Sequence, residues 1–434
     1  MARMKGLHAT AIFAFCAAVY FAAPMRLVMD SNYSMLLGES LCRHGTFKLD
    51  RYFQHPERHW PRAMATTNLT YHVYRHGGHI YYCYPPGSSV LSIPLVLAAK
   101  AAGVSPSHPR NGYDAGGELK IERAGAALVT ALAVTLLFLA ARGFLDSRRS
   151  AAVALVTAFA SGFFSTASRV MWSHTWGVCL LAAAILMLAR AATGGRLRPV
   201  LLATVLAWLY FTRPTFSLSI IAITVFVLVR YRREFLALAL TGAGWFALFV
   251  AFSHATSGHL LPPYFLLGGT MSLQQFLAGL SGTLLSPARG MFVYSPAVVI
   301  AFWLAARNRR TLSQPGLATV AAIATALHIV TVAAWPIWAA GFCYGARYGV
   351  DFVPWIALLA ALGWQAALAR GGRDNAARAI SCLLIAVSLA MQTIGAFSES
   401  AWRWNIEPDS VDENSPRIWS WRDAPFVRPF EARK

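Results

Sequence analysis

The sequence predicts an all-α polytopic membrane protein, and composition and hydropathy carry this prediction. Of the 434 residues, 57% are hydrophobic and only 13% are charged, and the mean hydropathy is +0.49. In soluble domains about a quarter of the residues are charged. Apolar runs of about 16–23 residues recur along the chain, and each is long enough to cross a bilayer as a helix. A soluble globular fold is therefore excluded.

We predict about eleven membrane-spanning helices from these runs. They cover residues 7–23, 123–141, 151–167, 174–191, 198–212, 215–230, 235–253, 292–306, 317–335, 348–368 and 378–396. The first is expected to be retained, because Ala22-Ala23-Pro24 is a poor site for signal peptidase.

Basic residues predict the orientation of these spans. Arginine clusters follow every even-numbered span: Arg142, Arg148 and Arg149; Arg190, Arg196 and Arg198; Arg230, Arg232 and Arg233; Arg307, Arg309 and Arg310; Arg370, Arg373 and Arg378. Because lysine and arginine mark cytoplasmic loops, the N-terminus is expected inside and the C-terminus outside. The formal charge of +20 is then explained by topology and anionic lipid rather than by nucleic acid.

We expect residues 1–434 to form a single integral membrane domain with two outer elaborations. The long first loop, residues 24–122, has amphipathic helical spacing over 31–41 and a second apolar helix over 88–102. A short tail, residues 397–434, is also expected outside. Cys42 and Cys83 both fall in the first loop, where a disulfide is permitted but not required.

Four arginines are expected at the outer ends of spans, where the topology rule does not explain them. They are Arg169, Arg213, Arg289 and Arg347. Arginine binds phosphate through paired, planar hydrogen bonds. A single carboxylate, Asp30, is expected at the same membrane surface. The pattern favours a phosphate-bearing, lipid-accessible substrate held beside that carboxylate.

Three motifs carry a resemblance to a known family. They are Asp30-Ser-Asn-Tyr33 after the first span, Tyr81-Tyr-Cys-Tyr-Pro-Pro-Gly87 in the first loop, and Arg347-Tyr348 near a late span. With the overall layout, they resemble the polyprenyl-phosphate-dependent glycosyltransferases of the GT-C superfamily. The chain is most similar to the branch of protein O-mannosyltransferases and bacterial aminoarabinose transferases. The resemblance implies a GT-C-type helix bundle in the bacterial inner membrane, with a periplasmic active site.

The chain departs from this family at three points. The second acid that often follows the first Asp is Ser31, so no acidic pair supports the alternative of a bound divalent metal, and no cofactor is assigned. The tyrosine comes one residue early, at Tyr33. Cys83-Tyr84 stands where the aminoarabinose transferases have Glu-Lys, so an arginine would have to bind the donor phosphate in place of lysine.

The resemblance implies an inverting transfer with Asp30 as general base for an acceptor hydroxyl. The donor and its phosphate are expected to contact Arg347, Arg213, Arg289, Tyr33, Tyr84 and Tyr344. Glu39, His174 and Arg169 are expected to support these groups. The expected partners are a polyprenyl-phosphate sugar, the lipid bilayer, and a lipid, glycan or secreted-protein acceptor. The sugar itself is not readable from the sequence.

Several alternatives stay open at this point. Asp30 has the position of an ordinary helix N-cap. Glu39 lies about two and a half turns further on, roughly opposite Asp30 on a helix, which favours a supporting role. His328 falls inside a predicted span and is left out of the site. A transporter or flippase of a lipid-linked or anionic solute would also need intramembrane arginines, although the chain lacks the matched repeats of such proteins.

Overall fold

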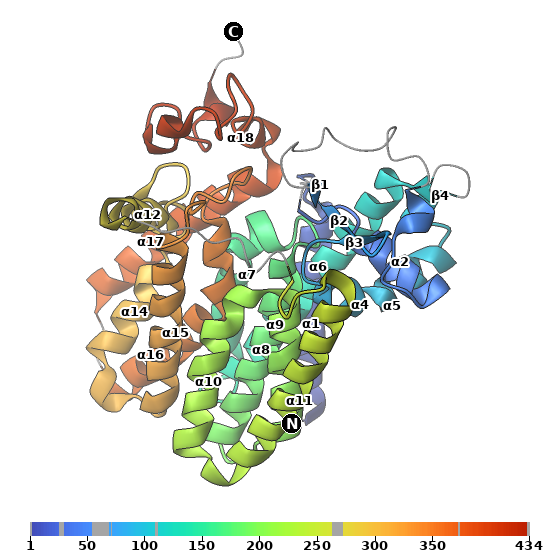
Figure 1. Ribbon diagram of the computed structural model, residues 1–434. Helices are drawn as coiled ribbons and strands as arrows, with labels where there is room; N and C mark the ends of the chain where they lie inside the picture. The colour runs from blue at the N-terminus through green and yellow to red at the C-terminus, as the bar shows by residue number, and fades with distance from the viewer. Residues whose placement is uncertain are drawn as a thin grey trace.

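The computed structural model describes residues 2–25, 30–53, 69–70, 72–108, 112–262, 272–371 and 374–431. Long helices pack side by side as a bundle, and shorter elements gather at its upper end (Figure 1). The N-terminus lies at the lower end and the C-terminus at the upper end. The prediction of an all-α membrane fold is confirmed.

Every predicted span falls on helical structure. The bundle consists of α1 (Ala2–Ala22), α6 (Ala115–Ala141), α7 (Ser147–Phe159), α8 (Ser173–Ala192), α9 (Pro199–Thr212), α10 (Ser217–Arg230), α11 (Arg232–Ser257), α14 (Val298–Arg307), α15 (Pro315–Ala333), α16 (Val353–Arg370) and α17 (Asn375–Phe397). Among the described residues, 6 helices are long and apolar enough to cross a membrane, and four shorter apolar helices accompany them. The predicted span over 151–167 is α7 followed by a separate turn, η2 (Phe163–Ala167).

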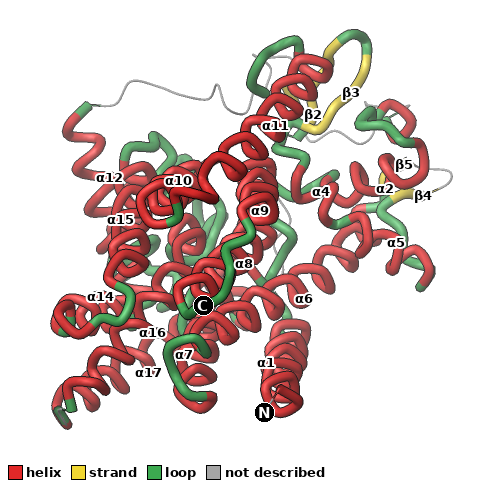
Figure 2. The backbone as a smooth tube through the Cα atoms, turned by 90° about the horizontal axis from the view of Figure 1, so that it is seen from below, coloured by secondary structure: helices red, strands yellow, loops and turns green. Residues whose placement is uncertain are grey.

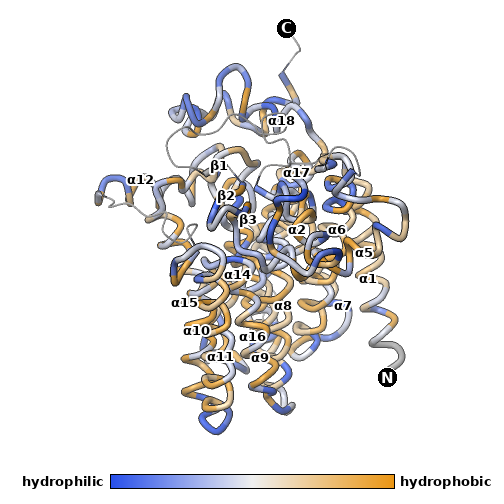
Figure 3. Tube along the Cα trace, turned by 45° about the vertical axis from the view of Figure 1, so that its right-hand side comes forward, coloured by the Kyte–Doolittle hydropathy of each residue, from blue (hydrophilic) through white to orange (hydrophobic). Residues whose placement is uncertain are grey.

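Small side chains let the central helices approach closely. Ala126, Ala131 and Ala133 of α6 are fully buried, and α6 packs against both α1 and α8. Small residues at helix contacts are typical of membrane proteins, where lipid removes the hydrophobic drive for association. By contrast, α11 keeps leucines such as Leu236 and Leu240 exposed. Figure 3 shows hydrophobic residues along the bundle helices and hydrophilic ones in the loops at the upper end.

The first loop has more structure than its amphipathic pattern predicts. The first expected helix is α2 (Ser34–His44). The second is divided into α4 (Gly87–Leu91) and α5 (Ile93–Ala101), with Pro94 in the first turn of α5. Proline has no amide hydrogen, so it starts helices better than it continues them.

A small antiparallel sheet follows α2 and was not predicted. Its strands are β1 (Leu69–Thr70), β2 (Val73–His76) and β3 (His79–Tyr82), in the order β1-β2-β3. The turn is Gly77-Gly78, with positive φ at both residues, as a two-residue hairpin turn requires. A further pair, β4 (Ser107–His108) and β5 (Gly112–Tyr113), precedes α6. Viewed from below, α2, α4, α5 and these strands group on one side and α12 (Leu273–Leu285) on the other (Figure 2).

The N-terminus of α2 is held by a carboxylate from α6. Glu118 is fully buried and accepts from the backbone amides of Tyr33 (2.9 Å), Met35 (2.7 Å) and Leu36 (3.2 Å). Its Oε2 also accepts from the Tyr113 hydroxyl at 2.6 Å. The N-cap position belongs to Tyr33, with φ of 70°. The capping role considered for Asp30 is therefore filled by Glu118.

Replacing Glu118 by alanine is expected to destabilise the first loop, because four donors would lose one buried acceptor. A buried donor left without its acceptor costs about 1–3 kcal/mol. Because local relaxation and water can satisfy some of the four donors, we expect a net loss of about 2–4 kcal/mol. The measurement is the thermal unfolding midpoint of the purified protein in detergent. Glu399→Ala is the matched control, because that side chain is 70% exposed. Equal midpoints for both variants would contradict this role.

Candidate functional site

Asp30 and Arg347 form an ion pair between the start of the first loop and the segment before α16. Arg347 Nη2 donates to Asp30 Oδ2. The Asp30 side chain is 24% exposed, whereas that of Arg347 is only 9% exposed. The Tyr82 hydroxyl, at the end of β3, donates to the Asp30 backbone oxygen at 3.2 Å. The carboxylate therefore keeps one accessible side while its cation is enclosed by the bundle.

The Arg347 guanidinium is fixed on several sides. It lies over the Trp172 ring, with Cζ 3.9 Å from the ring centroid. Nη1 donates to Ala340 O at 3.3 Å, and Nε donates to His174 Nε2 at 3.4 Å. Gly345, with φ of +63°, precedes this residue, and a Cβ there would lie 2.7 Å from the Tyr294 ring. The chain can turn into the short helix η6 (Arg347–Phe352) only because this position is glycine.

Asp351 is the functional candidate that the sequence analysis missed. It lies one turn after Arg347 in η6 and its side chain is fully buried. Its Oδ1 accepts from His174 Nδ1 at 2.6 Å, and its Oδ2 accepts from Arg213 Nε at 2.7 Å. The available signal was an isolated carboxylate inside an apolar run, which is costly in a membrane and usually functional.

His328 joins the same cluster although the sequence analysis left it out. Its Nε2 lies 3.6 Å from Asp351 Oδ2. The Thr215 hydroxyl donates to the same oxygen at 3.3 Å. Helices α8 and α15 and the α9–α10 corner thus converge on one carboxylate, and no local sequence signal shows which of their faces meet.

Arg213 reaches this cluster because proline follows it. Pro214 disfavours the helical conformation of the preceding residue, and Arg213 is extended with φ of −159°. Its Nη1 also donates to Ser173 Oγ at 3.1 Å. The corner sits close to α8 because residue 177 is glycine: a Cβ at Gly177 would lie 2.2 Å from the Phe216 ring.

Arg169 and Arg289 lie apart from this cluster and bind backbone carbonyls. Arg169 donates to Ala23 O (3.0 Å) and Tyr20 O (2.7 Å) at the end of α1. Arg289 donates through Nε to Ala339 O, and through Nη2 to Gly341 O and Asn405 Oδ1, at 2.8–2.9 Å. Both guanidinium groups therefore brace backbone beside the site.

Of the other residues predicted for the site, some pack within the fold and one lies beside Asp30. Tyr344 donates its hydroxyl to Met391 O at 2.8 Å and packs edge-on against Tyr294. Glu39 is buried and accepts from Ser105 Oγ at 3.2 Å, which ties α2 to the segment after α5. The Tyr33 ring packs against Phe53 and Tyr113. Tyr344 also lines a small hollow with Ser295 and Gln392, whereas Tyr84 lines the pocket next to Asp30.

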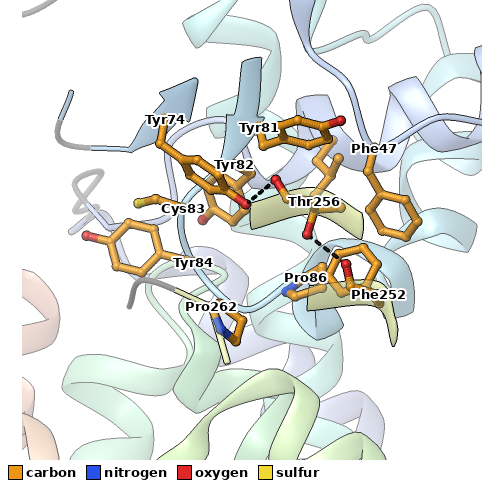
Figure 4. A pocket seen from close by; sticks show the side chains of 11 residues that line it. Phe47, Tyr74, Tyr81, Tyr82, Cys83, Tyr84, Pro86, Phe252, Thr256 and Pro262 are labelled. Atoms are coloured by element: carbon orange, nitrogen blue, oxygen red, sulfur yellow. Dashed lines mark hydrogen bonds between the residues drawn. The ribbon is translucent and has the colours of Figure 1, made fainter. Parts of the chain in front are cut away.

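That pocket lies between the end of the hairpin and the end of α11 (Figure 4). Together with the open solvent at its mouth, the hollow has a volume of about 350 Å³. It is lined by Leu37, Phe47, Tyr74, Tyr81, Tyr82, Cys83, Tyr84, Pro86, Phe252, Thr256 and Pro262. Tyr82 links it to Asp30 through the hydrogen bond described above. The walls are mostly aromatic and the site carboxylate is next to them.

Two titratable groups beside the pocket are uncharged at neutral pH. Burial lowers the pKa of His72 to about 4, although the nearby charge of Asp30 acts in the opposite direction. Burial also raises the pKa of the Cys83 thiol, and Asp30 raises it further. The charge of Asp30 is paired with Arg347. All six cysteines are free thiols, so Cys42 and Cys83 are not bridged.

Within the described ranges, no group of three or more His, Cys, Asp or Glu side chains is arranged to hold a metal ion. The buried carboxylates of α6 accept hydrogen bonds from the residues that follow Asp30. Glu122, for example, accepts from the Ser31 hydroxyl at 3.1 Å. The site as described is an arrangement of ion pairs and hydrogen bonds.

No protein-family model and no curated protein sequence matches this chain. Its fold does match solved structures. The Archaeoglobus fulgidus oligosaccharyltransferase tethered with an acceptor peptide aligns with a TM-score of 0.50 and 12% identity, over 94% of this chain and 58% of that chain. The apo form aligns with a TM-score of 0.50 and 11% identity, over 95% and 60%.

This chain thus spans about 60% of the length of those proteins, and at this identity the likeness shows the fold alone. The oligosaccharyltransferase is a GT-C glycosyltransferase, so the chain has a GT-C-type fold. The O-mannosyltransferase and aminoarabinose transferase branch named from the motifs stays a prediction.

Proposed function

We propose that this protein is an inverting GT-C glycosyltransferase that moves a sugar from a polyprenyl-phosphate donor to an acceptor hydroxyl. The observation that carries this proposal is the partly exposed carboxylate of Asp30 paired with the enclosed Arg347, in a bundle with the oligosaccharyltransferase fold. Within the proposal, the reaction takes place at the periplasmic face of a bacterial inner membrane.

The chemistry needs one base and one cation. The sugar of a lipid-phosphate donor already carries its leaving group on the anomeric carbon. Asp30 takes the proton of the acceptor hydroxyl as the new carbon–oxygen bond forms. The bond from the anomeric carbon to the phosphate oxygen breaks, and the phosphate leaves with the electron pair. Arg347 stabilises the charge that grows on that phosphate.

The charges of the cluster suggest how the two arginines differ. Arg213 is neutralised by Asp351, which is buried with it. Arg347 is neutralised by Asp30, which is nearer to solvent. An arriving phosphate can therefore share Arg347 with Asp30 without leaving a buried charge unpaired, which would be costly. In this proposal Arg347 is the main phosphate ligand, Arg213 supports it from behind, and Arg289 braces the 339–341 backbone.

The aromatic walls of the pocket suit the apolar part of the donor next to its phosphate. Tyr84 and Tyr82 line the pocket with their ring centroids 5.6 Å apart, and Phe252 comes from α11. The Tyr82 hydroxyl also donates to Asp30 O. The exposed leucines of α11 give this edge an apolar surface suited to lipid. We assign the first isoprene units of the donor to this pocket, which gives Tyr84 the donor-binding role expected from the sequence.

The competing function is a transporter or flippase of a lipid-linked solute. Purified protein mixed with a radiolabelled polyprenyl-phosphate sugar and membrane extract separates the two. A transferase releases polyprenyl phosphate and places the label on an acceptor, whereas a flippase leaves the donor intact. Glycan analysis of a deletion strain would then identify the acceptor, for which lipid, polysaccharide and secreted protein all remain candidates.

The proposal requires that the first loop lies on the outer side of the membrane, which cysteine labelling can test. Positions 57 and 114 of the first loop are both expected outside and could carry a cysteine label. Position 57 lies outside the described residues. Asp114 accepts from Gly117 N as the N-cap of α6, so its replacement would disturb the helix. Cys42 is a better probe, since it is native and exposed. In a variant with Cys42 as its sole cysteine, a membrane-impermeant maleimide is expected to label intact cells.

The matched probe for the opposite side is Ser313→Cys, in the exposed loop between α14 and α15. With this residue as the sole cysteine, labelling is expected only after permeabilisation. The reverse pattern would place the site in the cytoplasm and overturn the assignment of its substrates.

A further inference from the structure

His174 lies between the Arg347 guanidinium and the Asp351 carboxylate. Only one tautomer of the neutral ring can hydrogen-bond to both. Its Nε2 is 3.4 Å from Arg347 Nε, and its Nδ1 is 2.6 Å from Asp351 Oδ1. The ring is fully buried. Arginine Nε carries a hydrogen and can only donate, so His174 Nε2 must accept. The ring hydrogen then sits on Nδ1, where it is donated to Asp351.

We propose that Asp351 and His174 act as a positioning pair, which fixes His174 as the Nδ1–H tautomer and thereby aims Arg347 at Asp30 and the donor phosphate. The effect of this pair on catalysis rests on the proposed function, whereas the hydrogen bonds around His174 do not. A carboxylate that selects the tautomer of a histidine, whose other nitrogen then serves the reacting groups, is an established device of protein sites. Here the group that contacts the histidine is the Arg347 guanidinium rather than a metal or a nucleophile.

Asp351 is itself held so that one oxygen is directed to the histidine. Arg213 Nε (2.7 Å) and the Thr215 hydroxyl (3.3 Å) both donate to Oδ2. His328 Nε2 approaches the same oxygen at 3.6 Å. Oδ1 receives the His174 hydrogen bond. Since both oxygens are occupied and the side chain is fully buried, the carboxylate is fixed in orientation.

The aim of Arg347 depends on its Nε contact because the guanidinium is planar. Three positions define that plane: Nε on His174, Nη1 on Ala340 O, and Nη2 on Asp30. The face of the group lies on Trp172. If Nε lost its acceptor, the plane could rotate and displace Nη2 from Asp30. A misplacement of about 1 Å in a catalytic arrangement can reduce the rate by about a hundredfold.

The central comparison is between His174→Gln and His174→Leu in the full-length protein. Glutamine places a carbonyl oxygen close to the position of Nε2, so it can still accept from Arg347, whereas leucine cannot. We expect the leucine variant to lose about a hundredfold in kcat. The glutamine variant should lose about tenfold or less, since it restores the acceptor. Donor KM should change less than kcat in both, because the guanidinium remains present but misdirected.

Two kinetic results would overturn the positioning role. One is a leucine variant that folds and turns over like wild type. The other is a glutamine variant that is as impaired as the leucine variant while unfolding at the same temperature. Asp351→Asn adds a third comparison. It should lower kcat in the wild-type background and add a smaller loss in the His174→Gln background, because two groups in one chain of contacts are not additive. The part that remains reflects the buried Arg213, which loses its ion-pair partner.

A spectroscopic measurement tests the geometry without any activity. The protein is labelled with [15N]histidine, and the His174 signal is identified by its loss in His174→Gln. We expect a neutral ring with a protonated Nδ1 and an unprotonated Nε2. A protonated Nε2 or a cationic ring would overturn the inference whatever the transfer assay gives. The expected tautomer together with a wild-type protein that transfers no sugar would instead refute the proposed function and leave the geometry intact.

Discussion

Asp30→Asn is expected to lower sugar transfer by about a hundredfold to ten-thousandfold, which is the range for the loss of a general base. The amide has nearly the size of the carboxylate and can still accept from Arg347, but it cannot take a proton at neutral pH. Donor binding should persist, since Arg347 remains and no longer shares its charge with Asp30. The measurement is transfer by purified enzyme, with donor affinity determined in parallel.

The structure removes an ambiguity from this experiment. Had Asp30 been the cap of α2, asparagine would have replaced it without loss. The amides at the start of α2 bind Glu118 instead, so a wild-type rate for Asp30→Asn would contradict its catalytic role directly. Asp412→Asn is the matched control, because this aspartate lies exposed in the C-terminal tail. It should transfer like wild type.

Arg347→Ala carries the second largest expected effect. Removing one preorganised donor that stabilises developing charge costs about a hundredfold to a thousandfold in rate. Arg347 also forms three hydrogen bonds and covers Trp172, so the alanine variant is expected to unfold at a lower temperature as well. Both kcat and donor affinity should fall, because the proposed role is to hold the phosphate before and during its departure.

Arg347→Lys separates charge from geometry. Lysine restores a cation but has no planar fork, and it cannot contact His174, Ala340 O and Asp30 together. We expect it to recover donor affinity in part and turnover poorly. Arg196→Ala, at an exposed position in the loop between α8 and α9, controls for the loss of positive charge. If Arg347→Ala kept wild-type affinity and turnover at a temperature where it is folded, the phosphate assignment would be wrong.

The spans were predictable because each lies in one continuous run of sequence. Apolar runs and arginine-rich loops are local signals, and the helices fall where those signals predicted. The β2–β3 hairpin was equally local. Gly77-Gly78 between Val-Tyr-Arg-His and His-Ile-Tyr-Tyr is a two-residue turn signal, although helical periodicity does not reveal it.

The contacts within the site were not predictable in the same way. Asp30 and Arg347 were each singled out by residue type, but they are 317 positions apart and nothing local says that they meet. Glu118 caps α2 from 85 positions away. Asp351 was absorbed into a predicted span, although its charge there was a usable signal.

Arg169 and Arg289 show the limit of an argument from topology. Both are arginines that the positive-inside rule does not explain, and in the structure both donate to backbone carbonyls. A buried arginine with satisfied donors and one poised for phosphate have the same sequence signature. The hydrogen-bond acceptors around each guanidinium distinguish these roles, and only the folded structure shows which acceptors are there.

We propose that this bundle breaks the bond between sugar and lipid phosphate with Asp30 as base. The most direct test of this proposal is a proteoliposome assay with a radiolabelled polyprenyl-phosphate sugar and membrane extract as the source of acceptor. Free polyprenyl phosphate, labelled acceptor and intact donor moved across the membrane are all quantified. We expect equal amounts of polyprenyl phosphate and labelled acceptor for wild type, and about a hundredfold to ten-thousandfold less of both for Asp30→Asn. Intact donor crossing the membrane without cleavage, at the same rate in wild type and Asp30→Asn, would contradict the proposal.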